Sequence, residues 1–413
     1  MAGLFIVDFA LARCYNYRKG GIALKKLLVL LIALMLFASV LSSCGGGNKQ
    51  NYEALGKYDL NTYLDYYWES EAIYHESYLP LSSKEGEKEH EVTLMYKPDS
   101  IIAVQNFNAT VTYEEGKDYR LLNGKLYITE DSAIVRQPYE YYYHSENDPK
   151  KTSSGVLYNF GNGVYSPLFA NGEIQSKMIL VSYTHSDKWE GPVPASKGSK
   201  IPKTIEKLKS GKDVSIVLYG DSIAYGADSS CYYKGVFGEN WVPDYFDLAT
   251  AKLKEKYPSA NIKAVNTAVG GTGIKWAMDN LQGSVLDYSP DLVIVAFGMN
   301  DFSFTGKRYK EKISELLAEI RKTLPECEFI VVSTMMYNAD IADTASWHQQ
   351  DHQTYFGELE NEYTGLAFMN MTEIHQYLFT KKLFRDMTGN NINHPNDFLA
   401  RAYAQVLLKT MSE

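Results

Sequence analysis

From residue 213 onward, short apolar runs alternate with longer segments that carry apolar residues at helical spacing. The clearest helical period is in residues 306–323, where Ile313, Leu316, Leu317 and Ile320 share one face. This alternation predicts a parallel sheet with helices on both faces, and ligands of such sheets bind at the carboxyl ends of the strands. The expected strands are residues 214–219, 262–265, 292–297, 329–333 and 366–369, and the expected helices lie near residues 243–256, 274–285, 306–323, 350–363 and 396–411.

Residues 52–190 show a different pattern, in which short apolar and aromatic runs are separated by turn signals. Asn123-Gly124, between two such runs, predicts a hairpin. Short strands without a long helix predict an all-β sandwich domain of the jelly-roll kind. Residues 191–212 are rich in Gly and Pro and form the expected linker to a second domain at 213–413. The strand-like runs are residues 92–96, 101–104, 109–113, 125–129, 140–143 and 177–183.

Residues 1–44 have the pattern of an export signal, because Lys25 and Lys26 precede an apolar run at 27–40. This run is too short for a comfortable membrane span. It leads into Leu-Ser-Ser-Cys44, which resembles a bacterial lipobox and implies lipidation of Cys44. Residues 45–51 are the expected tether. We expect an exported protein held by this lipid anchor alone at the cell surface or a periplasm-facing membrane; the alternative is an ordinary signal peptide with an incidental cysteine.

The charge balance argues against nucleic acid as a partner. The chain has a net charge of −9, and residues 1–43 carry five basic residues against Asp8, so the remainder has a net charge of −13. No basic cluster offsets this charge. Cys231 and Cys327 follow the export signal, and their spacing leaves open whether they pair. No Cys or His residues stand at zinc-ligand spacing, and we expect neither a metal nor an organic cofactor.

Four short motifs stand at the expected strand ends or before the last helix: Gly220-Asp-Ser222, Gly270-Gly271, Gly298-Met-Asn300-Asp301 and Asn393-His394-Pro395. A serine at a strand-to-helix turn is exposed at the top of a sheet. Glycine N–H groups and an Asn amide are donors suited to a developing oxyanion. Each motif also has a structural interpretation, as a turn, a Gly-rich loop, a helix cap or a surface histidine.

In this order, the four motifs resemble those of the SGNH subgroup of the GDSL esterases and lipases, over residues 213–412. The resemblance implies a flavodoxin-like three-layer αβα sandwich. It also implies that Ser222 attacks an ester carbonyl and that His394 is the general base. The oxyanion hole would consist of the N–H groups of Ser222 and Gly271 and the side chain of Asn300.

The sequence departs from the family at one position. Many members have an Asp three residues before the His, where this chain has the neutral Asn391. Asp386 lies eight residues before His394, and both Asp386 and Asn391 are candidates for orienting the imidazole. Some members instead use a Ser–His dyad, with a backbone carbonyl orienting the ring. We favour a dyad over a role for Asp386.

A β-domain before an SGNH domain looks like the architecture of two-domain carbohydrate esterases, so the expected function is deacetylation of a polysaccharide or oligosaccharide. Trp241 and Trp347 are candidates for lining the cleft, and the aromatic stretch 66–75 is compatible either with sugar stacking or with docking of the two domains. Two alternatives remain open: a lipase or thioesterase on the same fold, and a glycan-binding lipoprotein with a degenerate site.

Overall fold

The computed structural model describes residues 60–146, 148 and 154–413, which belong to one compact unit. The predicted export signal, Cys44 and the tether lie outside the described residues. In the part of the chain that the structure describes, no helix is long and apolar enough to span a membrane. Cys231 and Cys327 are both buried and do not form a disulfide with each other.

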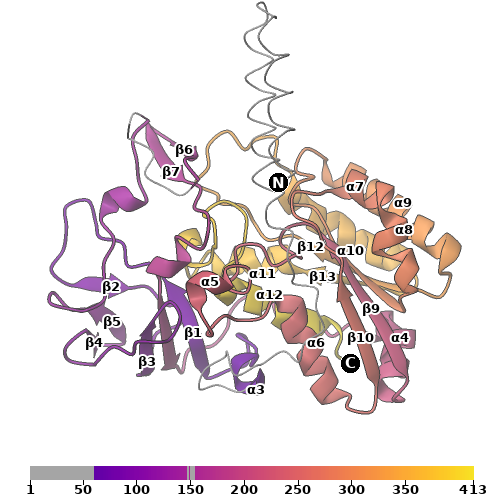
Figure 1. Ribbon diagram of the computed structural model, residues 1–413, viewed down its shortest axis with the longest axis horizontal. Helices are drawn as coiled ribbons and strands as arrows, with labels where there is room; N and C mark the ends of the chain where they lie inside the picture. The colour runs from indigo at the N-terminus through magenta and orange to yellow at the C-terminus, as the bar shows by residue number, and fades with distance from the viewer. Residues whose placement is uncertain (1–59, 147, 149–153) are drawn as a thin grey trace, which may run out of the picture. The chain divides into compact units, whose positions relative to one another are not determined.

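Five parallel strands form the sheet predicted for the C-terminal half (Figure 1). Their order across the sheet is β10-β9-β11-β12-β13, so the first strand along the chain lies between the second and the third. This is the flavodoxin-like order 2-1-3-4-5, and the predicted fold class is confirmed. The strands are β9 Asp213–Gly220, β10 Asn261–Asn266, β11 Leu292–Ala296, β12 Glu328–Ser333 and β13 Leu366–Asn370.

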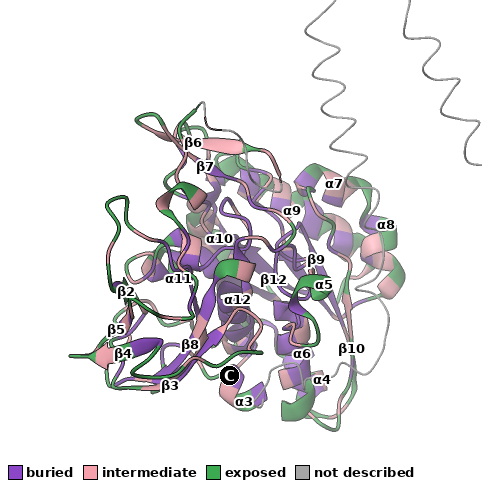
Figure 2. Cartoon of the chain, turned by 60° about the vertical axis from the view of Figure 1, so that its left-hand side comes forward, coloured by how far each residue is buried: buried purple, intermediate pink, exposed green. Residues whose placement is uncertain are grey.

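Two hydrophobic clusters cover the two faces of this sheet, whose strands other than the edge strand β10 are largely buried (Figure 2). The first cluster includes residues of α4 Pro202–Lys209, α6 Tyr245–Lys256, α11 Met371–Leu378 and α12 Asp397–Thr410. The second includes residues of α7 Ile274–Asp279, α8 Leu281–Ser284, α9 Gly306–Thr323 and α10 His352–Glu362. The four apolar residues predicted to share one face of α9 all belong to the second cluster.

Antiparallel strands precede the α/β part, as predicted. Their sheets have the orders β1-β8-β3, β2-β5-β4 and β6-β7, whereas a jelly roll distributes its eight strands over two sheets. Asn123 and Gly124 connect β4 to β5 with φ of 52° and 71°, the hairpin turn that the sequence predicts. The strands are β1 Ala72–Tyr78, β2 His90–Val92, β3 Ser100–Asn106, β4 Tyr119–Leu122, β5 Lys125–Ile128, β6 Leu157–Gly161, β7 Val164–Pro167 and β8 Ile179–Thr184.

Some local predictions differ from the structure. Residues 109–113 form no strand, and residues 140–143 overlap the 3-10 turn η2 Tyr139–Tyr141. The predicted linker 191–212 contains α4, whose Ile205 and Leu208 are buried. These aliphatic side chains pack in the core cluster that also holds residues of β1, β3 and β9, so the antiparallel and parallel parts share one core. The remaining short elements are α3 Leu60–Tyr63, α5 Lys234–Phe237, η3 Gln175–Lys177, η4 Gly198–Lys200, η5 Leu286–Tyr288, η6 Gln349–Asp351 and η7 Phe384–Asp386.

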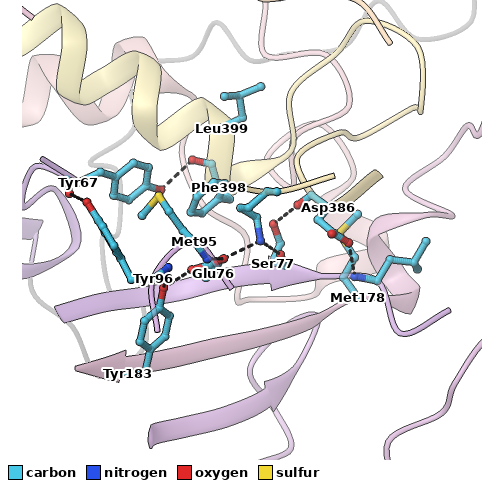
Figure 3. A network of polar contacts seen from close by, with 12 residues as sticks. Tyr67, Glu76, Ser77, Met95, Tyr96, Met178, Tyr183, Asp386, Phe398 and Leu399 are labelled. Carbon is cyan, nitrogen blue, oxygen red and sulfur yellow. Dashed lines mark hydrogen bonds and ion pairs between the residues drawn. The ribbon is translucent and has the colours of Figure 1, made fainter. Parts of the chain in front are cut away.

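A buried polar network joins β1 to the segment before α12 (Figure 3). The side chains of Glu76 and Lys382 are fully buried and form an ion pair with 2.6 Å between Oε1 and Nζ. The N–H of Met95 and the hydroxyl of Tyr183 donate to the two carboxylate oxygens of Glu76 at 2.7 and 2.6 Å. Because buried charges persist only when they are paired and hydrogen-bonded, this network holds β1 against the C-terminal segment.

Tyr67, in the aromatic stretch 66–75, docks the antiparallel part against α12. Tyr67 is buried and stacks on Phe398 of α12 with 4.9 Å between ring centroids, and its hydroxyl donates to the Phe398 carbonyl at 2.9 Å. The side chain of Arg401 donates to the same hydroxyl at 2.7 Å. Tyr67, Trp68 and Ile73 of this stretch are buried, so these side chains are used within the protein core rather than presented to a ligand.

Candidate active site

The loops after β9, β10 and β11 are tied together at one edge of the sheet. The N–H of Val269, after β10, donates to the carbonyl of Gly220 at 3.0 Å. The N–H of Met299, after β11, donates to the Asp221 carboxylate at 3.3 Å. Because these three strands are neighbours in the sheet, the hydrogen bonds bring the Ser222 turn between the other two loops.

The tight approach of the Ser222 turn to β11 requires a glycine. A Cβ on Gly220 would lie 2.5 Å from both the Ala296 carbonyl oxygen and the Ala224 Cβ, so no larger residue fits. The next residue, Asp221, is buried and accepts the N–H of Ile223 at 3.0 Å in addition to that of Met299. Burial raises the pKa of the Asp221 carboxyl to about 7. Asp221 thus braces the turn that presents Ser222.

Ser222 and His394 meet as the sequence predicts. The Ser222 Oγ lies 2.8 Å from the His394 Nε2, although the two residues are 172 positions apart in the chain. This is the distance at which an imidazole accepts a proton from a hydroxyl. The pair joins the turn after β9 to the loop before α12.

The loop that carries His394 is built around the side chain of Asn390. Its Oδ1 accepts the N–H groups of Ile392, Asn393 and His394 at 2.9, 3.0 and 3.1 Å. The Thr388 hydroxyl donates to the His394 carbonyl at 3.0 Å. Because one side-chain oxygen accepts three successive backbone N–H groups, it fixes the backbone around the histidine where there is no regular secondary structure.

The second ring nitrogen of His394 is hydrogen-bonded to a residue that the sequence analysis did not single out. Its Nδ1 lies 2.5 Å from the Asp228 Oδ2, and the side chains of His394 and Asp228 are 17% and 10% exposed. The other oxygen, Oδ1, accepts the hydroxyl of Tyr233 at 2.5 Å. Ser222, His394 and Asp228 therefore have the connectivity of a Ser–His–Asp triad, in which the carboxylate orients the imidazole and stabilises its protonated form.

This geometry corrects the expectation about the histidine's partner, which was a dyad, Asp386 or Asn391. Asp386 is buried away from His394; its Oδ1 accepts the N–H of Leu79 at 2.9 Å, and its carbonyl accepts the Ser77 hydroxyl at 2.6 Å (Figure 3). Burial raises the pKa of the Asp386 carboxyl. Its position beside β1 makes it part of the network that holds β1 in place.

Asn391 serves the fold in a similar way. Its Nδ2 donates to the Ser166 hydroxyl at 2.8 Å and to the Pro167 carbonyl at 2.9 Å, and its Oδ1 accepts the Tyr142 hydroxyl at 2.5 Å. An aspartate here would place an acceptor against the Pro167 carbonyl, which cannot donate. The neutral side chain is therefore suited to this contact with the antiparallel part.

No local signal in the sequence distinguishes Asp228. It follows Ser222 by six residues and precedes two serines, a composition typical of any turn. Its φ of 59° is left-handed, which Asp tolerates better than most residues, but this too is common in turns. Only the long-range approach of the His394 loop identifies it.

The predicted oxyanion donors Gly271 and Asn300 lie in the two loops that are hydrogen-bonded to the Ser222 turn. Gly271 has a φ of 74° and is exposed, a left-handed conformation that suits glycine. The Asn300 Nδ2 donates to the Thr272 carbonyl at 2.8 Å, which uses one of its two N–H groups; within the described residues the second has no other acceptor and is available to a ligand. Neither Asn300 nor Asp301 caps α9, because its N-cap is Thr305. Asp301 instead accepts the N–H of Ile274, the first residue of α7, at 3.1 Å.

An aromatic cluster lies beside Asn300. Phe302 is 39% exposed, and its ring centroid lies 5.4 Å from that of Trp347, which packs in turn against Tyr337 at 4.7 Å. The next residue, Asn338, donates its N–H to the Ile392 carbonyl in the His394 loop at 2.8 Å. The aromatic cluster Phe302, Trp347 and Tyr337 therefore connects the Asn300 loop to the His394 loop.

Trp241, the other tryptophan predicted to line the cleft, is in a different setting. The Lys234 Nζ lies 4.0 Å from its ring centroid, so one face of the indole is covered. Within the described residues, no group of three or more His, Cys, Asp or Glu side chains is arranged to hold a metal ion.

Comparison with solved structures gives low-identity matches. The chain is similar to a two-domain esterase active on acetylated mannans, with 21% identity and a TM-score of 0.41; the match covers 53% of this chain and 52% of that one, about half the length of that protein. It is also similar to a GDSL-like lipase from Parabacteroides merdae, with 18% identity and a TM-score of 0.40; the match covers 47% of this chain and 94% of that one. A third similar structure is that of an acetyl-xylooligosaccharide esterase variant from Geobacillus, with 15% identity and a TM-score of 0.40; the match covers 48% of this chain and 94% of that one.

A search of curated proteins found no match. Residues 218–400 match the family described as GDSL-like Lipase/Acylhydrolase, a range that begins in β9 and ends in α12 and includes Ser222, Asp228 and His394. The resemblance inferred from the four motifs is therefore confirmed for residues 218–400, the part of the chain that matches the GDSL-like lipase/acylhydrolase family.

Proposed function

We propose that this protein is a serine ester hydrolase that removes small acyl groups, acetyl above all, from a glycan, with Ser222, His394 and Asp228 as its catalytic triad. The observation that carries the proposal is the unbroken chain of hydrogen bonds from the Ser222 Oγ through the two His394 nitrogens to the Asp228 carboxylate, with steps of 2.8 and 2.5 Å. The interpretation as a degenerate glycan-binding protein rested on a missing carboxylate, and Asp228 removes that reason.

The chemistry follows from this connectivity. As the Ser222 Oγ attacks the ester carbonyl carbon, its proton moves to the His394 Nε2, and Asp228 stabilises the imidazolium. The imidazolium then protonates the leaving sugar oxygen, which leaves an acyl-serine. Water attacks the acyl carbon, again losing a proton to Nε2, and the Ser222 oxygen takes that proton back when the carboxylic acid departs. The N–H groups of Ser222 and Gly271 and the free Asn300 N–H stabilise the oxyanion in both halves.

The aromatic cluster supports a sugar as the alcohol part of the substrate. The apolar faces of sugar rings pack on aromatic side chains, and the exposed Phe302 with the half-buried Trp347 offers such a surface two residues from Asn300. A glycan bound there would present an acyl group on one of its hydroxyls to Ser222. We propose that this cluster holds the sugar next to the reactive ester.

The experiment that tests the function is a chain-length series of nitrophenyl esters from acetyl to palmitoyl, together with acetate release from acetylated xylan and mannan. The proposal expects acetyl to be the best acyl group and acetate to be released from at least one polysaccharide. A preference for palmitoyl would indicate a lipase instead. Failure of every short-chain ester to exceed the Ser222→Ala background would refute the proposal.

Replacing Trp347 with Ala is expected to raise KM for an acetylated oligosaccharide about tenfold, because loss of one aromatic contact costs about 1–1.5 kcal/mol. The kcat/KM for nitrophenyl acetate should stay within about twofold, since that ester has no sugar to stack. The matched control is Trp241→Ala, which removes an indole already covered by Lys234 and should leave both substrates unchanged. Equal effects of the two variants on the oligosaccharide would contradict this role for Trp347.

Export with a lipid anchor at Cys44 is proposed from the sequence alone. A bacterial host that expresses the full chain should incorporate labelled palmitate into the protein, which should sediment with membranes. The Cys44→Ala variant should lose the label and leave the membrane fraction, because the lipid is the only proposed anchor. Membrane association that persists in this variant would contradict the proposal.

A further inference from the structure

A segment of the antiparallel part touches the loops of the triad directly. We call residues 164–177, from β7 through η3, the docking segment. Within it, the side chain of Gln175 is buried, and its Nε2 donates to the backbone carbonyl of Asp228. This bond joins residues 53 positions apart and holds the carbonyl of the residue whose carboxylate contacts His394.

Asp228 needs such support because its backbone is left-handed, with a φ of 59°, a conformation that costs energy in any residue with a Cβ. The His394 loop also packs closely against it: a Cβ on Gly389 would lie 2.1 Å from the Asp228 carbonyl oxygen. Gln175 therefore contacts Asp228 at the same carbonyl where the two catalytic loops meet. A shift of that peptide would move the carboxylate away from the His394 Nδ1.

The docking segment also holds the His394 loop. The Ser166 hydroxyl and the Pro167 carbonyl accept both N–H groups of the Asn391 side chain at 2.8 and 2.9 Å. The N–H of Phe169 donates to the Asn390 carbonyl at 3.1 Å. One continuous segment of 14 residues, 164–177, thus binds both loops that supply the His–Asp pair, from a part of the chain outside the region that matches the hydrolase family.

We infer that the docking segment is a positioning element of the active site, and that Gln175 in particular acts on the reaction through Asp228. The inference rests on the proposed function. It assigns to the antiparallel part a role in the chemical step that is separate from any binding of the glycan. Asn391 stands where many members of the family carry the catalytic acid, and in this chain its side chain binds the docking segment. The carboxylate comes instead from Asp228, in the loop that the same segment supports.

The test is a double-mutant cycle on nitrophenyl acetate, a substrate too small to reach a separate sugar site. Gln175→Met keeps the length and burial of the side chain and removes the donor. It is expected to lower kcat about 10- to 100-fold with little change in KM, because a displaced catalytic group costs rate rather than ground-state binding. In an Asp228→Asn background the same substitution should change kcat less than about threefold, since its effect passes through the carboxylate.

Gln405→Met is the matched control. Gln405 is also a buried glutamine whose Nε2 donates to a backbone carbonyl of the antiparallel part, that of Asp65 at 2.6 Å, but it makes no contact with the triad. It should lower the thermal midpoint as much as Gln175→Met while kcat stays within about twofold. A kcat for Gln175→Met no lower than that of this control would overturn the inference. The inference would also be overturned if Gln175→Met lowered kcat by the same factor in the Asp228→Asn background as in the unsubstituted protein.

If Gln175→Met does not fold, the Ser166→Ala variant tests the positioning role of the docking segment instead. It removes one acceptor of Asn391, and the inference expects kcat to fall about threefold or more at unchanged KM; an unchanged kcat overturns it. Full activity of Asp228→Asn alone would overturn the triad and the inference together. Inactive Asp228→Asn beside fully active Gln175→Met would overturn the inference and leave the proposed function standing.

Discussion

Asp228→Asn is expected to lower kcat for nitrophenyl acetate by about 10⁴-fold while KM changes little. The amide is neutral, so it stabilises the imidazolium much less than the carboxylate does. Its NH₂ group also favours the wrong tautomer of His394, with the proton on the nitrogen that must accept one from Ser222. Steady-state kinetics over a range of substrate concentrations separates kcat from KM.

Asp386→Asn is the matched control for this prediction. The substitution keeps an oxygen for the N–H of Leu79, and burial already favours the uncharged form of this carboxyl. Its kcat should therefore stay within about threefold of the unsubstituted protein, with any cost appearing in the thermal midpoint. A larger kcat loss in Asp386→Asn than in Asp228→Asn would point to Asp386, the carboxylate that the sequence offered as an alternative to a dyad, and refute the triad described above.

Ser222→Ala is expected to lower kcat by about 10⁶-fold, the scale on which a serine hydrolase loses its nucleophile. The fold should be unaffected, because within the described residues the Ser222 hydroxyl is hydrogen-bonded to His394 alone. Thermal melting checks the fold, and acetate release in long incubations measures the residual rate. More than about 1% of the original kcat would show that another group performs the attack.

The α/β part could be predicted in some detail because its signals are local. Buried parallel strands are near-continuous apolar runs, and the amphipathic period of α9 marks residues 306–323, the bounds that the structure has. Ser222 and His394 each stand in a short motif next to a strand end or a helix start, and the resemblance of the ordered motifs to the SGNH subgroup implied their roles. The order of the motifs then placed them at one edge of the sheet.

The acid of the triad could not be predicted in this way. Asp228 is recognised only by its contact with His394, 166 positions away, and no local pattern encodes that approach. Asn391 stands three residues before the histidine, but this spacing says nothing of the four partners that hold its side chain: Tyr142, Ser166, Pro167 and Asn338. Long-range hydrogen bonds decided which polar residue serves the site and which serves the fold.

The antiparallel part was the least predictable. The run 140–143 is rich in tyrosine and suits a strand, yet Tyr142 is buried in a turn where its hydroxyl meets Asn391. The full extent of the strand β1 was not predicted, because its sequence mixes His75 and Glu76 among aromatic residues. The buried charge of Glu76 is accommodated by Lys382 together with the N–H of Met95 and the hydroxyl of Tyr183. Tertiary partners outweigh local propensity at both places.

The central claim is that Ser222 is an activated nucleophile, and labelling by a fluorophosphonate tests it most directly. This reagent phosphonylates a serine only when a neighbouring base activates it. Mass spectrometry of the labelled, digested protein should show one adduct per chain, on the peptide that contains Ser222, with labelling much slower in Asp228→Asn. Absence of an adduct, or an adduct on another serine at the same rate in Ser222→Ala, would contradict the account.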